Sequence, residues 1–226
     1  SLKRLNTDRI DLYYLHWPHS TMNLEETLRT LDDLVRQGKI LYPACSNFPA
    51  WLLCRSLWIE DVGHLAPLVA GQYPYNLIER GVEVEVLPLA QAMRLGIVAY
   101  RPLSAGVLTG KYGQGVPSDA RGVSDDRLHP WATRYADGIS KLEALARERG
   151  YSTADAALAW VRSHPAMTAP IVGISRMEQL EENLKGFAWE MTAADRQLVG
   201  SFFATEVWEE QGGRFPSWRR AFDILA

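Results

Sequence analysis

Polar side chains that could do chemistry follow apolar runs at several points of the chain. His16 comes at the end of one such run, and the pair Ser46 and Asn47 follows another. Gln72 and Tyr100 lie at the ends of two more. A histidine can donate a hydrogen bond to an oxygen on which negative charge develops, and small polar side chains at the end of a buried strand can meet a ligand. The pattern therefore predicts a site assembled at the carboxyl ends of strands.

A second group of candidate residues lies in the segment "GISRMEQLEEN". Ser175 is followed three residues later by Glu178, which is the spacing of a capping box and predicts the start of a helix. The N-terminus of a helix attracts phosphate, and Arg176 adds a full positive charge. The same residues would also suit a capped helix with a solvated, charged face. Spacing alone leaves both readings open.

Apolar runs alternate with stretches of helical periodicity along the whole chain. The predicted strands are 10–17, 40–46, 68–73, 97–100 and 169–172. The predicted helices are 24–35, 50–60, 84–95, 134–149, 154–163, one from about 177, and 192–203. Strands separated by helices form a parallel sheet with right-handed crossovers, so the sequence predicts a single α/β domain.

Two α/β architectures compete for this pattern. A doubly wound sheet usually carries G-x-G-x-x-G after a strand, and the sequence has no such match. A (β/α)8 barrel collects its chemistry at strand ends, where the polar residues lie here. The barrel is favoured, although about five strand and helix units can be counted and a barrel needs eight.

Composition narrows the range of partners. The 226 residues are 47% apolar and carry a formal charge of −3, with basic residues scattered rather than clustered, which argues against a nucleic-acid partner. No apolar run approaches a membrane span, and no leader precedes the first motif, so we expect a cytoplasmic protein without a membrane partner. Cys45 and Cys54 show no metal-ligand spacing, and we expect no metal and two reduced, buried thiols.

Five long segments, in order, resemble the aldo-keto reductases. They are "SLKRLNTDRIDLYYLHWP", "SNFPAWLL", "GQYPYNLIER", "VAYRPLSAGVLTGKY" and "PIVGISRMEQLEENL". The resemblance implies an α/β fold of the (β/α)8 TIM-barrel type, one domain over 1–226 with a tail at 204–226, in which the first three strands of the barrel are absent from this sequence. It also implies NADP(H) as cofactor and a small-molecule carbonyl or alcohol as substrate.

The resemblance also implies a role for each candidate residue. His16 is the active-site histidine that orients the substrate carbonyl, and Tyr100 stacks on the nicotinamide ring. The nicotinamide carboxamide is bound by Ser46, Asn47 and Gln72. The pyrophosphate loop contains Arg101, Pro102, Leu103, Ser104, Gly106 and Lys111, with Arg121 beyond it. The adenosine 2′-phosphate is bound by Gly173, Ser175, Arg176 and Gln179, and the adenine by Glu182 and Asn183.

The sequence departs from the family pattern in two ways. The family's general-acid tyrosine, with its lysine and aspartate, belongs to the first three barrel units, and nothing here matches them; neither Tyr13 nor Tyr14 is nominated in its place. Three explanations stay open: a truncated protein, a longer protein, or a fragment completed by a partner chain. In addition, Pro43 lies within a predicted strand, where it removes a donor.

Three functions follow from these observations. The first is an NADP(H)-dependent reductase. The second is a non-catalytic NADP(H)-binding module that resembles potassium-channel β-subunits, and the third is an inactive fragment. The chain could act as a monomer or a homo-oligomer.

Overall fold

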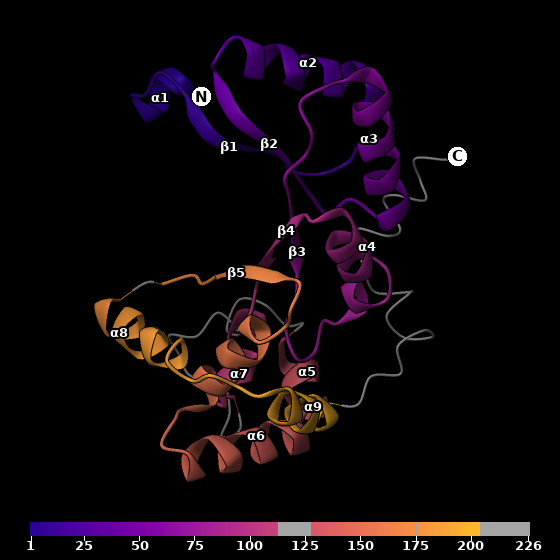
Figure 1. Ribbon diagram of the computed structural model, residues 1–226. Helices are drawn as coiled ribbons and strands as arrows, with labels where there is room; N and C mark the ends of the chain where they lie inside the picture. Colours follow the sequence, from indigo (N-terminus) through magenta and orange to yellow (C-terminus); the bar gives the residue numbers. More distant parts are fainter. Residues whose placement is uncertain (113–127, 175, 204–226) are drawn as a thin grey trace. The chain divides into compact units, whose positions relative to one another are not determined.

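The computed structural model describes residues 1–112, 128–174 and 176–203 (Figure 1). Within them the strands are β1 (Ile10–Leu15), β2 (Ile40–Ser46), β3 (Ala70–Pro74), β4 (Gly96–Tyr100) and β5 (Met167–Ile171). They form one five-stranded sheet in the order β1-β2-β3-β4-β5. The predicted α/β fold with a parallel sheet is confirmed, as in part of a (β/α)8 barrel.

Helices separate the strands along the chain. They are α1 (Leu2–Leu5), α2 (Leu24–Arg36), α3 (Ala50–Gly63), α4 (Val86–Met93), α5 (Leu128–Arg134), α6 (Ala136–Glu148), α7 (Thr153–Arg162), α8 (Met177–Gly186) and α9 (Ala193–Ser201), with 3-10 turns η1 (Gly81–Glu83) and η2 (Ser104–Thr109). The described residues divide into two compact units, 1–73 with 81–98 and 74–80 with 99–203. Each unit is described by itself.

The core of the first unit lies between strands β1 and β2 and helices α2 and α3. Asn23 caps α2 by accepting a hydrogen bond from the Glu26 amide at 3.2 Å. Leu24, Leu28 and Leu31 then recur at helical spacing and are buried against Ile40, Cys45, Phe48, Leu52, Leu53 and Leu68. This single apolar stripe explains why the helix could be predicted so closely from the sequence.

Strand β2 lies between β1 and β3 and pairs in parallel with both. Pro43 does not interrupt it, because the Val69 amide donates to the Pro43 carbonyl at 3.0 Å. Leu12 and Tyr42 are partners in the β1–β2 register and stay 37% and 55% exposed. Tyr13 and Leu15, which alternate with Leu12 along β1, pack against the core instead.

Helix α3 carries apolar residues all around its circumference. Leu52 and Leu53 face the core, whereas Trp58 is 65% exposed on the outer face. Cys54 is also exposed, so the prediction that both cysteines are buried is correct for Cys45 and wrong for Cys54. A helix that is apolar on every side gives no periodicity from which the buried face could be read.

The second unit is built around α7, which packs against α6, α8, β5 and η2. A capping box begins α7: the Asp155 amide donates to Ser152 Oγ at 3.1 Å, and the Ser152 amide donates to the Asp155 carboxylate at 2.9 Å. Residues 156–161 of α7 are all buried. Trp160 is the largest of the fully buried side chains.

Helix α8 approaches α7 closely at Gly186. A Cβ placed at Gly186 would lie 2.9 Å from the Asp155 Cα and 3.1 Å from its carbonyl oxygen. Alanine ordinarily favours a helix over glycine. Here we expect Gly186→Ala to lower the free energy of unfolding by about 1–3 kcal/mol, because the backbone must move. Urea unfolding followed by circular dichroism measures this, with the exposed neighbour Lys185→Ala as control. An unchanged or raised midpoint for Gly186→Ala would contradict the close approach.

No helix of the described residues is long and apolar enough to cross a membrane.

Candidate active site

The predicted residues of the first unit lie where β1 and β2 end and in the middle of β3, and they are joined by hydrogen bonds. Asn47 Nδ2 donates to the His16 carbonyl at 3.2 Å and to Ser46 Oγ at 2.9 Å. The Gln72 carbonyl accepts from Ser46 Oγ at 3.0 Å and from the Asn47 amide at 3.1 Å. The structure therefore brings His16, Ser46, Asn47 and Gln72 together, as the sequence pattern predicts.

The Ser46–Asn47 turn is rigidly held. Both side chains are buried, at 1% and 3% exposure, and Asn47 has a left-handed backbone with φ 62°. Asparagine tolerates this conformation better than most residues. In contrast, His16 is exposed. Its ring can therefore reach a ligand from a backbone that Asn47 holds in place.

Tyr14 belongs to this group, although the sequence reasoning did not select it. The side chain of Tyr14 hydrogen-bonds with that of Gln72, and burial raises the pKa of Tyr14. Residues 14 and 16 of an extended strand point to the same face. The two-residue spacing from His16 is the signal from which Tyr14 could have been found.

In the second unit, the predicted pyrophosphate loop follows β4 directly. Pro102 and Ser104 are buried, Leu103 and Gly106 are half-buried, and Arg101 and Lys111 are exposed. The backbone is left-handed at Arg101 (φ 56°), Ser104 (φ 47°) and Gly106 (φ 96°). Glycine suits position 106 because of its positive φ, whereas an added Cβ would meet only the flexible end of Lys111.

Ser104 has an orphaned hydroxyl. Its side chain is 1% exposed, and its Oγ has no hydrogen-bond partner among the described residues. A buried polar group without a partner costs about 1–3 kcal/mol. A ligand oxygen in this loop would supply the missing partner, so the loop fits the phosphate-bearing group that the resemblance implies.

Tyr100 ends β4 and, like the nearby Glu79, is half-buried. Burial, followed by the Glu79 carboxylate, raises the pKa of Tyr100 to about 12. Partial burial also raises the pKa of the Glu79 carboxyl group. Tyr100 therefore stays neutral at physiological pH, which suits an aromatic contact rather than proton transfer.

The predicted phosphate-binding residues lie at the start of α8. Gly173 and Arg176 are exposed, and Gln179 is half-buried. The described helix α8 has Arg176 as its N-cap, without a side-chain cap hydrogen bond. The capping box predicted at Ser175 concerns a residue outside the described part of the chain.

The two residues predicted to bind adenine lie on α8, and some other predicted residues lie outside the described part of the chain. Glu182 is exposed whereas Asn183 is 8% exposed, so this pair divides between the surface and the interior. Ser175 and Arg121 lie outside the described residues, as does the tail at 204–226. Within the described ranges, no group of three or more histidine, cysteine, aspartate or glutamate side chains could hold a metal ion.

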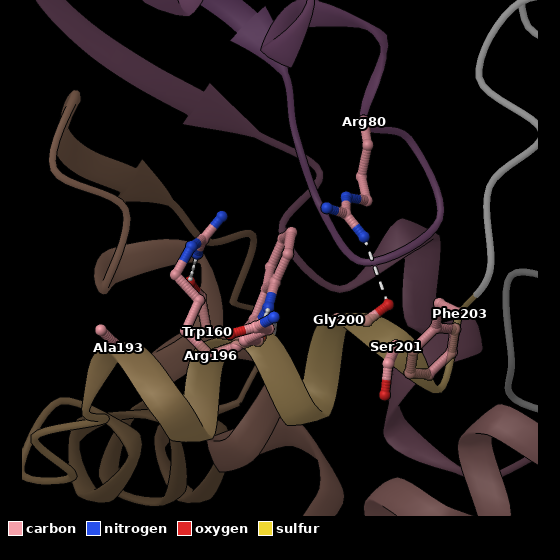
Figure 2. Close-up of a pocket in the computed structure, with 8 residues that line it drawn as sticks. Arg80, Trp160, Ala193, Arg196, Gly200, Ser201 and Phe203 are labelled. Carbon is pink, nitrogen blue, oxygen red and sulfur yellow. Dashed lines mark hydrogen bonds between the residues drawn. The ribbon is translucent and has the colours of Figure 1, made fainter.

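A separate pocket of about 390 Å³ lies in the second unit against α9 (Figure 2). Arg80 Nη1 donates to the Gly200 carbonyl at 3.2 Å, and Arg196 Nη1 donates to the Trp160 carbonyl at 2.6 Å. Both guanidinium groups also lie against the Trp160 ring, 5.2 Å and 4.2 Å from its centroid. These arginines bind carbonyls near the ends of α7 and α9, so they hold helices together. None of the predicted site residues lines this pocket.

Comparison with known proteins matches residues 1–202 to the model of the Aldo/keto reductase family. The chain is 37% identical over 203 residues to an uncharacterized oxidoreductase, YrpG, of Bacillus subtilis (strain 168), which covers 90% of this chain and 61% of that protein. It is 34% identical to a probable voltage-gated potassium channel subunit beta of Arabidopsis thaliana (82% and 58% covered) and 34% identical to the L-glyceraldehyde 3-phosphate reductase of Escherichia coli O157:H7 (82% and 55%). The chain spans about three fifths of the length of the curated relatives it matches.

Proposed function

The chain belongs to the aldo/keto reductase family, and on this basis we propose that it is an NADP(H)-dependent oxidoreductase acting on an aldehyde, a ketone or the corresponding alcohol. The observation that carries the proposal is the hydrogen-bonded group of His16, Ser46, Asn47 and Gln72, which forms where β1 and β2 end beside β3. We further propose that both compact units belong to one barrel domain.

In this proposal each residue of the first unit has a defined task. When bound, the nicotinamide supplies the hydride that adds to the carbonyl carbon. The His16 ring donates a hydrogen bond to the carbonyl oxygen and stabilises the negative charge that develops there. The amides of Asn47 and Gln72 hold the carboxamide and so fix which face of the nicotinamide meets the substrate. The proton that completes the alcohol is assigned to no residue of this chain, because the resemblance places its donor on a tyrosine without a match here.

Taken by itself, the second unit has residues that suit the phosphates of the proposed cofactor. Ser104 Oγ would gain the partner it lacks among the described residues, and the Arg176 guanidinium would pair with the 2′-phosphate. A 2′-phosphate distinguishes NADPH from NADH. Arg176 is therefore the residue of the described chain on which the choice between the two cofactors depends most.

We expect the protein to bind NADPH at least about tenfold more tightly than NADH, because a hydrogen bond to a charged group contributes about 1.5–3 kcal/mol. Arg176→Gln should weaken NADPH binding by about tenfold and leave NADH binding unchanged. Fluorescence titration with both nucleotides measures this. The matched control is Lys185→Gln, which removes a positive charge at the other end of α8. A protein that binds neither nucleotide would overturn the proposal.

A second candidate function is a nucleotide-binding module without turnover. The observation that favours it is the 34% identity to a protein named as a potassium channel subunit beta. An assay of the full natural protein with NADPH and a panel of aldehydes and ketones separates the two functions. Turnover supports the reductase, and tight NADPH binding without turnover supports the module.

A further inference from the structure

Asn76, which follows β3 in the second unit, uses the whole hydrogen-bonding capacity of its side chain. Nδ2 donates to the Arg101 carbonyl at 2.9 Å and to Glu79 Oε2 at 2.7 Å. Oδ1 accepts from the backbone amides of Ile78 at 2.9 Å and Glu79 at 2.8 Å. Backbone amides only donate, so they fix which end of the Asn76 amide is oxygen. The side chain is 0% exposed and has a single orientation.

The Arg101 carbonyl joins Asn76 to the predicted cofactor loop. It accepts from Asn76 Nδ2 and also from the Ser104 amide at 2.8 Å. Asn76 and Ser104 therefore donate to the same carbonyl oxygen. The buried hydroxyl of Ser104 has no partner among the described residues.

This part of the loop is held in an unfavourable conformation. Arg101, Ser104 and Ala105 all have a left-handed backbone, with φ of 56°, 47° and 54°. Such residues persist only where their surroundings fix them, and they gather where a ligand is clamped. The hydrogen bond from the buried Asn76 side chain to the Arg101 carbonyl fixes the first of the three.

Glu79 sets the direction of the Asn76 amide from the other side. Its Oε2 accepts one of the two Nδ2 protons, which leaves the second aimed at the Arg101 carbonyl. The Glu79 side chain is itself half-buried. Asn76 and Glu79 lie only three residues apart, so the bond between them is local. Among the four side-chain bonds of Asn76, only the one to Arg101 reaches a residue far along the chain, 25 positions later.

We propose that Asn76 is a positioning residue for the cofactor: it holds Arg101 and Ser104 in the strained backbone that receives the pyrophosphate, and so slows cofactor release. This rests on the proposed function, since it concerns the same nucleotide. No role in hydride transfer itself is assigned to Asn76.

The test uses two substitutions that separate the loop bond from local folding. Asn76→Asp keeps the acceptor for the two backbone amides and removes both Nδ2 donors, but it sets two carboxyl groups against each other. When Glu79→Gln is added, the new side-chain amide at position 79 can donate to the carboxylate at position 76. The bond to the Arg101 carbonyl is still missing in this double variant. Glu79→Gln alone is the matched control, because its side-chain oxygen can still accept from Asn76.

Stopped-flow release of NADPH from the full protein gives the main readout, and thermal unfolding gives the control. The double variant should unfold at a lower temperature, because the Arg101 carbonyl loses its donor, so release is measured well below the unfolding midpoints of all three proteins. There the double variant should release NADPH about tenfold faster than the unsubstituted protein, whereas Glu79→Gln should release at the original rate. A release rate for the double variant within twofold of the original would overturn the proposal.

Amide hydrogen exchange without nucleotide keeps this result distinct from a failure of the proposed function. The Ser104 amide should exchange faster in the double variant than in Glu79→Gln. Equal exchange in the two variants would overturn the proposal even if NADPH binds. Absence of NADPH binding in the unsubstituted protein would overturn the proposed function, and the cofactor role of Asn76 with it.

Discussion

Replacing Trp160 by alanine is expected to lower the free energy of unfolding by about 4 kcal/mol, the range found for large aromatic side chains removed from a core. Trp160 is fully buried and stacks on Tyr75 with ring centroids 5.3 Å apart. Its indole Nε1 donates to the Arg196 carbonyl at 3.0 Å. The substitution therefore leaves a cavity, removes the indole hydrogen bond to the Arg196 carbonyl and takes away the aromatic surface beside the Arg196 guanidinium group.

Urea unfolding followed by circular dichroism measures this effect. Trp58→Ala is the matched control, because Trp58 is 65% exposed on α3 and should change stability by no more than about 0.5 kcal/mol. Trp160→Phe keeps an aromatic ring and should fall between the two. If Trp160→Ala costs less than Trp160→Phe, the buried ring is not what holds the second unit together.

The stability of the protein is expected to fall as pH rises from about 4.5 to 7, with Glu60 as a main cause. Glu60 is 2% exposed, and burial raises its pKa to about 7, although the Leu68 amide donates to Oε2 at 3.0 Å. The unfolded pKa of a glutamate is about 4.3, so the folded state binds the proton more tightly. Ionising Glu60 in the folded protein then removes about 4 kcal/mol of stability, and the loss is complete above the folded pKa.

Glu60→Gln should remove most of this pH dependence, because a neutral amide does not ionise. Unfolding free energies of both proteins, measured between pH 4.5 and 8, give the difference attributable to Glu60. Glu79, whose pKa burial also raises, leaves a residual slope of the same sign in the variant. Glu85→Gln, at an exposed position, should keep the original curve. Parallel curves for the Glu60 variant and the unsubstituted protein would show that Glu60 does not ionise in this range.

The elements with one buried stripe were predictable from the sequence, and their ends less so. Helix α2 was expected over 24–35 and extends over Leu24–Arg36. Strand β3 was expected over 68–73 but extends over Ala70–Pro74, and β5 begins two residues earlier than expected, at Met167. Where a strand begins depends on the neighbouring strand with which it pairs, and the local hydrophobic pattern of the sequence does not indicate that pairing. The 3-10 turn at Ser104–Thr109 needs positive φ at Ala105, which no sequence rule suggests for alanine.

Some residues of the candidate site could likewise be predicted from the sequence, and others could not. His16, Ser46, Asn47 and Gln72 could be predicted because each follows an apolar run and belongs to a recognisable motif. Asn76 and Arg196 could not, because their importance comes from partners distant in sequence. The bond from Arg196 to the Tyr75 hydroxyl joins residues 121 positions apart. A single sequence contains no local signal for such a pair.

The difference in exposure between Cys45 and Cys54 determines how the protein reacts with thiol reagents. Burial raises the pKa of Cys45 to about 12, and its side chain is 0% exposed, so almost no thiolate forms there at neutral pH. Cys54 is exposed on the outer face of α3. Since the thiolate is the nucleophile, a maleimide or iodoacetamide probe reacts at Cys54 alone while the protein stays folded. Cys54 is therefore a single site at which these 226 residues can carry a spectroscopic label, close in sequence to the exposed indole of Trp58.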